Sequence, residues 1–294
     1  MSGRCAEVVT APEMTDAAAR LGQFFTPQPV VEFAYDALEL CGASLNGMTV
    51  VDPACGPGGW LVGVLQRDPQ LAVGCDCDPG MIEAWRASSL VEHPPCLLCV
   101  LDALVPEVLP HGHFDLVVGN PPFGTKLAKA SERDLTAIAG AYRLWRAAEP
   151  LRLLAPGLTT TELARLRRFP LEILFLERFV QLCRPGGWIA IVLPEGIMAN
   201  ARWRYVRRWL LDTVTLRAVV GLPRDTFRRQ RTTAKTCLLL AQNMPPPTHH
   251  RVALAEVDEC TAECFARLLE AWRAGEEMTS AYPDGLLPPP VMRT

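Results

Sequence analysis

The stretch GNPPFGT, residues 119–125, joins an amide side chain to a rigid turn and an aromatic ring, directly after the apolar run FDLVVG. Two consecutive prolines cannot donate backbone hydrogen bonds, and Pro121 disfavours helical geometry at Asn120. An amide, a carbonyl and a ring can therefore be aimed at one flat substrate by the turn made of Asn120, Pro121, Pro122 and Phe123. The structural alternative is that Asn-Pro simply opens a loop, as it often does.

A glycine loop forms a second candidate site. The stretch VVDPACGPGGWL places Asp52 at a strand end, followed by Gly56, Gly58 and Gly59 before a helix. Glycines let a ligand approach the backbone closely, and the N-terminus of the following helix offers unpaired N–H groups. The spacing differs from the dinucleotide-binding pattern G-x-G-x-x-G, so the loop alone does not specify its ligand.

Two further strands also end in acids. Asp76, in GCDCDP, can accept hydrogen bonds from both hydroxyls of a ribose, and Asp102 is placed to accept from an exocyclic amine. Any one such acid is more often a turn residue or a helix cap. Acids at three successive strand ends predict a ligand site along one edge of a parallel sheet.

Alternating strand and helix patterns must position these residues. Strand-length apolar runs begin near residues 48, 71, 96, 114, 188, 215 and 232, and segments with helical spacing separate most of them. We therefore predict an α/β fold with a seven-stranded, mostly parallel sheet, helices on both faces and an antiparallel last strand. Residues 124–168 read as a helical insert. A short strand near 251–257 and a helix near 264–272 are too short for a second domain.

The composition is that of an ordinary globular protein, with 294 residues of which 49% are hydrophobic and 21% charged. No apolar run approaches the ~18–20 residues of a membrane helix, and the N-terminus lacks a secretory pattern. We therefore expect a cytoplasmic protein without membrane contact. Its eleven cysteines are then expected to be reduced thiols.

Charge is segregated along the chain, although the net charge is only -3. Residues 1–120 carry 4 basic and 15 acidic side chains, residues 121–235 carry 21 and 9, and residues 236–294 carry 4 and 8. The basic block is almost entirely arginine, which suits phosphate and base contact, so we expect a polyanionic partner. A solvated basic face is the alternative. The helix expected at 201–213 is open to two readings, facing DNA or packing Trp203 and Trp209.

These motifs together resemble the N6-adenine DNA methyltransferases, specifically the methylation subunits of type I restriction-modification systems. GQFFTPQPVVEFA resembles their N-terminal cofactor motif, VVDPACGPGGWL the glycine motif, GCDCDP the ribose acid and GNPPFG the catalytic tetrapeptide. The resemblance implies a Rossmann-like, S-adenosylmethionine-dependent methyltransferase fold. It implies a catalytic domain over 1–241, with 242–294 as a C-terminal extension and no recognisable target-recognition domain.

The resemblance also assigns roles to individual residues. The cofactor residues that it implies are Phe25, Thr26, Asp52, Pro53, Ala54, Gly56, Gly58, Asp76, Asp102 and Asn120. It makes Asn120, Pro121, Pro122 and Phe123 catalytic, places Phe123 and Phe227 against the target base, and leaves Arg228, Arg229 and Arg231 as candidates for the DNA backbone. Pro57 and Trp60 depart from the family pattern, and Pro57 removes one loop N–H. No metal is expected.

The tetrapeptide suits methyl transfer to adenine N6. That amine is conjugated with its ring, and two oxygens that accept its N–H groups return electron density to the nitrogen. A base in a duplex must first be flipped out, where aromatic faces can hold it. A separate specificity protein is expected to choose the DNA sequence. The alternatives are an RNA or protein-amide methyltransferase, or a catalytically silent subunit that binds cofactor or DNA.

Overall fold

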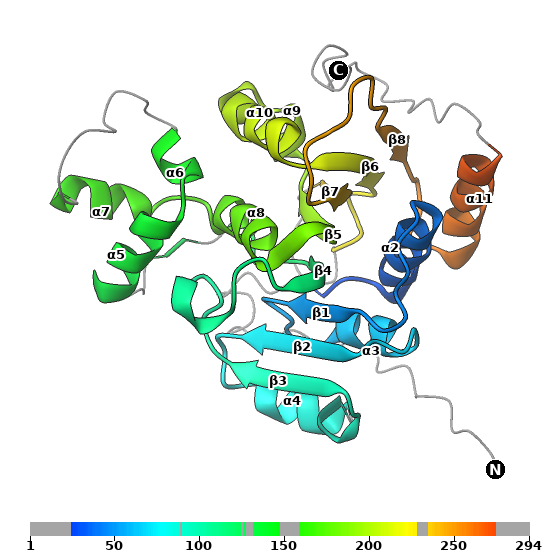
Figure 1. The fold of residues 1–294 in the computed structure, drawn as a ribbon, viewed down its shortest axis with the longest axis horizontal. Coiled ribbons are helices and arrows are strands. Elements are labelled where there is room, and N and C mark those ends of the chain that lie inside the picture. Colours follow the sequence, from blue (N-terminus) through cyan, green and yellow to red (C-terminus); the bar gives the residue numbers. More distant parts are fainter. Residues whose placement is uncertain are drawn as a thin grey trace.

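The computed structural model describes residues 25–88, 90–124, 126–127, 132–147, 159–227 and 235–274. These residues form one sheet in the order β3-β2-β1-β4-β5-β7-β6-β8, with helices on both faces (Figure 1). The strands are β1 (Thr49–Asp52), β2 (Leu71–Asp76), β3 (Cys96–Val100), β4 (Phe114–Gly119), β5 (Cys183–Pro194), β6 (Thr215–Leu222), β7 (Thr236–Gln242) and β8 (Ala253–Glu256). The predicted α/β architecture is confirmed.

The sheet has eight strands rather than the predicted seven. The additional strand, β8, pairs in parallel with β6, with Ala253 opposite Ala218 and Glu256 opposite Gly221. It has only four residues, most of them half-buried, so its apolar pattern is too short to mark it as part of the sheet. The other strands are parallel except β7, which pairs antiparallel with both β5 and β6 as predicted.

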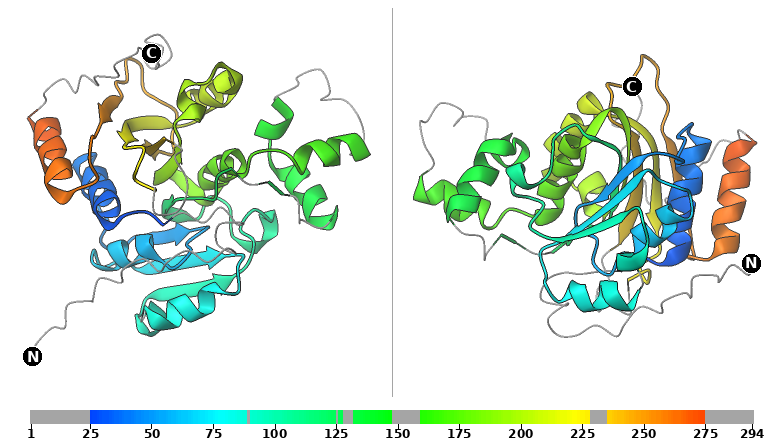
Figure 2. Two further views of the ribbon diagram at one scale, coloured as in Figure 1. Left: turned by 180° about the vertical axis from the view of Figure 1, so that it is seen from behind. Right: turned by 60° about the horizontal axis from the view of Figure 1, so that its bottom comes forward.

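Two hydrophobic clusters cover the two faces of the sheet. One cluster joins the sheet to α2, α3, α4 and α11, and the other joins it to the insert helices, α8, α9 and α10 (Figure 2). The helices are α2 (Gln28–Leu40), α3 (Gly59–Leu65), α4 (Met81–Ala87), α5 (Glu132–Ala141), α6 (Leu144–Ala147), α7 (Thr160–Leu166), α8 (Leu171–Leu182), α9 (Gly196–Ala199), α10 (Arg204–Thr213) and α11 (Ala262–Arg273). Three of these helices, α5, α6 and α7, lie within residues 124–168.

The segment after β7 packs on the sheet and on its helix layer. Helix α11 lies beside α2 in Figures 1 and 2, at the opposite side of the molecule from the insert. The rings of Phe33 and Phe265 stack between the two helices, with their centroids 4.6 Å apart. No described helix is both long and apolar enough to cross a membrane.

Strand β5 begins earlier than the sequence predicts. The apolar run was expected to begin near residue 188, but β5 starts at Cys183, which lies opposite Phe114 before the register shifts to Leu116 opposite Trp188. Gly187 makes this possible, since a Cβ there would lie 2.8 Å from the carbonyl oxygen of Asp115. Gly187 thus accommodates an irregularity within the strand that directly follows the end of α8.

Strand register brings the predicted site residues to one edge of the sheet. Strands β1 and β2 are parallel with Asp52 opposite Gly74, and Asp76 lies opposite Val100 at the end of β3. Because β7 runs antiparallel, Thr236 at its start lies opposite the last residues of both β5 and β6. The loop between β6 and β7 therefore leaves and re-enters the sheet at this same carboxyl edge.

Candidate active site

The glycine loop connects β1 to α3 and is tied to the neighbouring strand. The backbone N–H of Cys55 donates to the carbonyl oxygen of Cys75, at 2.8 Å. Gly58 is the N-cap of α3 with a φ of 95°, and a Cβ at this position would lie 2.3 Å from Leu90 Cδ1. Both the backbone conformation and the space thus require glycine at the start of the helix.

Phe25 and Thr26 reach this loop from the N-terminal segment. A Cβ on Gly56 would lie 3.4 Å from the ring of Phe25, and Trp60 Nε1 donates to Thr26 Oγ1 at 3.2 Å. The structure therefore brings these two predicted cofactor residues to the glycine loop. Trp60, a departure from the family pattern, makes a hydrogen bond that a phenylalanine could not make.

Asp76 shapes the glycine loop as well as ending β2. Its Oδ2 accepts from the backbone N–H of Gly56 and its Oδ1 from that of Asp78, each at 2.9 Å. Burial raises the pKa of this carboxyl, the two backbone hydrogen bonds lower it, and the net shift is upward. Each carboxylate oxygen has a second lone pair, so the same group can still accept from a ligand hydroxyl.

Asp52 is the most deeply buried acid of the loop, with 1% of its surface exposed. Its Oδ1 accepts from the backbone N–H of Ala54 at 3.1 Å. Its Oδ2 is also buried and has no hydrogen-bond partner among the described residues. A buried carboxylate oxygen in this state is stabilised by a donor from a ligand. An ammonium group such as that of an amino-acid cofactor fits this requirement.

Asp102 follows β3 and opens the loop that leads to β4. Its Oδ1 accepts from the backbone N–H of Leu104 at 3.0 Å. Burial and then the charges of Asp76 and Asp102 raise the pKa of the Cys77 thiol to about 11. Cys77 therefore lies within electrostatic range of both acids, as expected if they line one edge of the sheet.

The residue before the tetrapeptide lies close to the glycine-loop acid. Gly119 ends β4, and a Cβ at this position would lie only 2.6 Å from Asp52 Oδ1 and 3.3 Å from the ring of Phe179. The strand thus passes directly over the Asp52 carboxylate, and Asn120 follows with 9% of its surface exposed. Both this close approach and the backbone φ of 150° favour glycine at position 119.

Phe123 and Phe227 meet each other at the same edge. Their ring centroids lie 6.0 Å apart with an interplanar angle of 75°, an edge-to-face pair. They are 4% and 1% exposed, respectively, and belong to the hydrophobic cluster on the α2 face of the sheet. The structure therefore brings together the two rings predicted to contact the target base, and buries both.

The predicted DNA-contact arginines Arg228, Arg229 and Arg231 lie outside the described residues. On helix α10, Arg207 is buried and donates to the carbonyl oxygens of Ile197 and Asn200, both at 2.8 Å. Trp203 and Trp209 pack against the core. The sequence left open whether this helix faces DNA or packs its tryptophans into the protein. Packing of the two tryptophans is what the structure shows.

Three residues that the sequence analysis did not single out hold the loops of the site. Trp85 of α4 donates from Nε1 to the carbonyl oxygen of Gly56 at 2.7 Å. Arg178 of α8 and Tyr142, which follows α5, bond to backbone carbonyls of the loop after Asp102. No local pattern marks these contacts, because each depends on a partner far away along the chain.

The cysteines near the site are poorly suited to nucleophilic chemistry. Burial raises the pKa of the Cys55 thiol well above its ordinary value, and the charges of Asp52 and Asp76 add to the rise. Burial likewise raises the pKa of Cys75 to about 12. Within the residues that the structure describes, no group of three or more His, Cys, Asp or Glu side chains is arranged to hold a metal ion.

Known proteins resemble this chain in sequence and in fold. The Escherichia coli type I restriction enzyme EcoEI methylase subunit is 23% identical over 228 residues, which are 71% of this chain and 40% of that protein. A type I restriction-modification methyltransferase subunit from Streptococcus thermophilus superposes with a TM-score of 0.62 at 21% identity, covering 93% of this chain and 60% of that one. The chain spans less than half the length of the curated relatives that it matches.

A family model gives the wider assignment. The model described as N-6 DNA Methylase matches residues 5–68 and 102–261. The matched ranges include the glycine loop, Asp102, the tetrapeptide and the loop between β6 and β7. Asp76 lies between them, so its place in the site rests on its hydrogen bonds to the glycine loop. The match covers well over half of the sequence, and the chain belongs to the N-6 DNA methylase family.

Proposed function

We propose that this chain is an S-adenosylmethionine-dependent methyltransferase that modifies the N6 amine of a flipped adenine in DNA. Family membership supports the reaction class. The observation that carries the proposal is the contact between the end of β4 and the glycine-loop acid, where Gly119 packs against Asp52. This contact joins the predicted amine acceptors to the predicted cofactor loop in one site.

The cofactor side of the site fits S-adenosylmethionine, which supplies a sulfonium methyl group when bound. Asp52, with its buried and unpartnered Oδ2, would receive the ammonium group of the methionine part. Asp76 would receive the ribose hydroxyls and Asp102 the adenine amine. The ring of Phe25 and the backbone of Gly56 would close the cradle between them.

The tetrapeptide would hold the target amine. The side-chain oxygen of Asn120 and the backbone carbonyl of Pro121 would accept its two N–H groups and so raise the electron density on nitrogen. Positive charge that develops on this nitrogen would be stabilised by the same two oxygens. The rigid Pro121-Pro122 turn would keep them in place without further ordering at the moment of reaction.

The aromatic pair would hold the flipped base. Stacking of a base on an aromatic ring contributes roughly 1–3 kcal/mol. Because Phe123 and Phe227 are both buried within the same hydrophobic cluster, a base that stacks on either ring must displace side chains that cover it. Base entry would therefore move the start of the loop between β6 and β7.

DNA and a separate specificity protein are the proposed partners. The homologous subunits named above belong to type I restriction-modification systems, and the basic character of residues 121–235 suits contact with phosphates. The proposed catalytic unit comprises residues 1–241, with 124–168 as a helical insert. Residues 242–294 form the extension, of which β8 and α11 pack on the sheet.

Replacement of Asn120 tests the proposal. Asn120→Ala should lower methyl transfer to DNA by roughly 10²-fold or more, the scale of losing one aligned polar stabiliser. S-adenosylmethionine affinity should change little, because the lost interaction strengthens mainly in the transition state. Transfer of labelled methyl groups to DNA in the presence of the specificity partner measures the first quantity, and calorimetry measures the second.

Asn46→Ala is a suitable control, because Asn46 is exposed and precedes β1 at the opposite end of that strand. It should retain full activity and full cofactor affinity. A stable Asn120→Ala protein with undiminished turnover, compared with an active wild type, would rule out the proposed role. The Asn-Pro-Pro turn would then be only the start of a loop.

A further inference from the structure

We propose that Tyr142 and Arg178 are positioning residues that orient Asp102 toward the adenine amine of the cofactor. This inference rests on the proposed function, because it presumes that Asp102 faces that amine. It concerns two side chains outside the sequence motifs, one within the insert and one on α8.

A single peptide group connects Arg178 to Asp102. Nε of Arg178 donates to the carbonyl oxygen of Ala103 at 2.7 Å. The N–H of the same planar peptide group, on Leu104, donates to Asp102 Oδ1 at 3.0 Å. The guanidinium therefore fixes the plane of the peptide that orients the carboxylate, and it polarises the N–H toward it.

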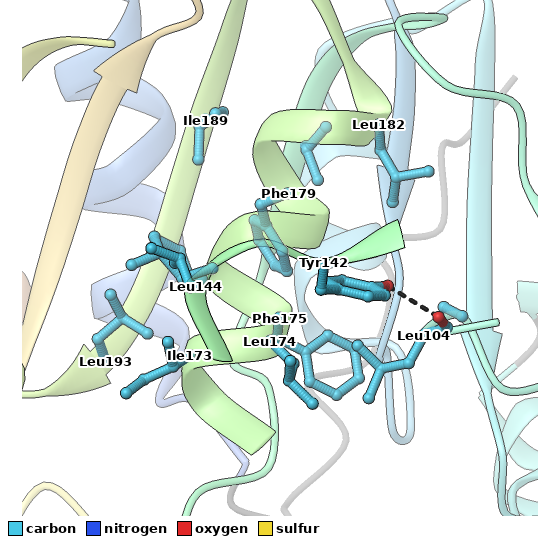
Figure 3. Packing of buried hydrophobic residues seen from close by; sticks show 14 of the residues in the cluster. Leu104, Tyr142, Leu144, Ile173, Leu174, Phe175, Phe179, Leu182, Ile189 and Leu193 are labelled. Carbon is cyan, nitrogen blue, oxygen red and sulfur yellow. Dashed lines mark hydrogen bonds between the residues drawn. The ribbon is translucent and has the colours of Figure 1, made fainter. Parts of the chain in front are cut away.

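Tyr142 holds the next peptide group of the loop. Its hydroxyl donates to the carbonyl oxygen of Leu104 at 2.8 Å (Figure 3). Leu104 is thus bonded on both sides, by its N–H to Asp102 and by its carbonyl to Tyr142. Any rotation of this residue that frees the Asp102 carboxylate must break the bond to Tyr142.

Arg178 also holds two further carbonyls of the loop. Nη2 donates to the carbonyl oxygens of Pro106 and Leu109, at 3.2 and 3.3 Å. Arg178 has no exposed surface, and no carboxylate of the described residues lies within ion-pair distance of it. A buried guanidinium that bonds to carbonyls instead of a carboxylate is expensive to maintain, and here its donors order one loop.

Helix α8 in turn fixes Tyr142 itself. Glu177 is 3% exposed, and its two carboxylate oxygens accept from the backbone N–H groups of Arg143 and Leu144 at 2.7 and 2.9 Å. Gln181 donates to the carbonyl oxygen of Ala141 at 2.9 Å. The residues on both sides of Tyr142 are therefore bonded to α8, and Figure 3 shows its ring beside Phe175 with the hydroxyl directed at Leu104.

The test compares two cofactor products that differ only at the base. S-adenosylhomocysteine carries the exocyclic amine that Asp102 would accept, whereas S-inosylhomocysteine carries a carbonyl at that position. Wild-type protein should bind the adenosyl compound more tightly in calorimetry. Tyr142→Phe should weaken binding of the adenosyl compound roughly threefold to tenfold, the effect of one neutral hydrogen bond, and should change binding of the inosyl compound less than twofold.

A matched control and a second variant complete the design. Tyr205→Phe removes a buried hydroxyl that has no hydrogen-bond partner among the described residues, and should leave both affinities unchanged. Arg178→Lys keeps the positive charge but loses the planar set of guanidinium donors. If this variant folds, it should also weaken binding of the adenosyl compound and not that of the inosyl compound. Tyr142→Phe, which removes one oxygen, keeps the proposal testable if Arg178→Lys does not fold.

The outcomes separate this inference from the proposed function. Equal weakening of both compounds by Tyr142→Phe would mean that Tyr142 only stabilises the fold, and no weakening would mean that the loop does not need it. Either result overturns the inference and leaves the proposed function intact. Wild-type protein that binds neither compound, or binds both equally, would instead contradict the proposed role of Asp102 and the inference with it.

Discussion

The two halves of the carboxyl edge are built differently. The half formed by β1, β2 and β3 presents acids whose oxygens already accept backbone hydrogen bonds, as Asp76 does from Gly56 and Asp78. The half formed by β4 to β8 presents a proline turn and two buried rings in edge-to-face contact. The first half is organised for a ligand before the ligand arrives, whereas in the second half the two buried rings must first be uncovered.

This difference implies different free-energy costs for the two ligands. A ligand that enters a preformed site loses little of its binding energy to reorganisation of the protein. A base that must uncover a buried ring binds with part of its interaction energy offset by the packing contacts that are lost. We therefore expect substitutions in the first half to change cofactor affinity directly, and substitutions in the second to change DNA binding and turnover.

Asp76→Ala should have the largest of the effects that sharpen this comparison. A carboxylate that accepts from two ribose hydroxyls makes charge-assisted hydrogen bonds, each contributing roughly 1.5–3 kcal/mol. The substitution also removes the acceptor for the Gly56 N–H, so S-adenosylmethionine affinity should fall at least about tenfold in calorimetry. DNA affinity, measured in parallel, should not change. Unaltered cofactor binding by a folded variant would place the ribose site elsewhere.

A triple variant should change only the DNA binding ascribed to the second half of the edge. In this variant alanine replaces Arg228, Arg229 and Arg231. Each contact between a basic side chain and a phosphate contributes about 0.9 to the log–log dependence of DNA affinity on salt. The variant should therefore bind DNA with a smaller salt slope, while its S-adenosylmethionine affinity stays the same. If fluorescence anisotropy at several salt concentrations gives the wild-type slope and affinity, this loop does not touch DNA.

Asp52→Asn should have a smaller effect, on stability, and the size of this effect depends on pH. Burial raises the pKa of the Asp52 carboxyl well above its ordinary value, and the Asp76 charge adds to the rise while the Ala54 amide opposes it. The folded chain therefore keeps this proton above about pH 4, where the unfolded chain loses it. Folding stability accordingly falls as pH rises from that value through the raised pKa.

Asp52→Asn removes this loss of folding stability at higher pH. In the absence of cofactor, the Tm of the variant should therefore exceed that of the wild type at pH 7 and match it below about pH 4. For a domain of this size roughly 2–4 °C corresponds to about 1 kcal/mol. Asp115→Asn is a control for which the opposite change in stability is expected. Although burial raises the Asp115 pKa, hydrogen bonds from Thr49 and Arg184 lower it overall, so this variant should be less stable at pH 7. Equal Tm values for wild type and Asp52→Asn across the pH range would contradict the cost ascribed to burying Asp52.

The sequence predicts the first half of the site better than the second. Acids that follow apolar strands, and glycines before a helix, are local signals, so the residue pattern alone places Asp52, Asp76, Asp102 and the glycine loop at one edge of a sheet. The contact between Phe123 and Phe227 required a family resemblance, since 103 residues separate them.

The supporting residues could not be predicted, for a physical reason. Tyr142 bonds to a carbonyl 38 residues away and Arg178 to one 75 residues away. Backbone carbonyls carry no residue identity, so no pattern in the sequence marks which side chain will reach them. The same holds for β8, whose four residues enter the sheet because β6 offers an unpaired edge.

The position of β7 has a consequence for synthesis of the chain. It lies between β5 and β6 although it follows both, so the edge of β5 cannot be paired with β7 until residues 195–235 have been made. At about 5–20 residues per second that takes roughly 2–8 s, during which an apolar strand edge is open to other chains. The nascent segment 195–235 carries ten basic and three acidic residues. Its positive charge, suited to phosphate in the finished protein, would repel neighbouring copies while the edge is exposed.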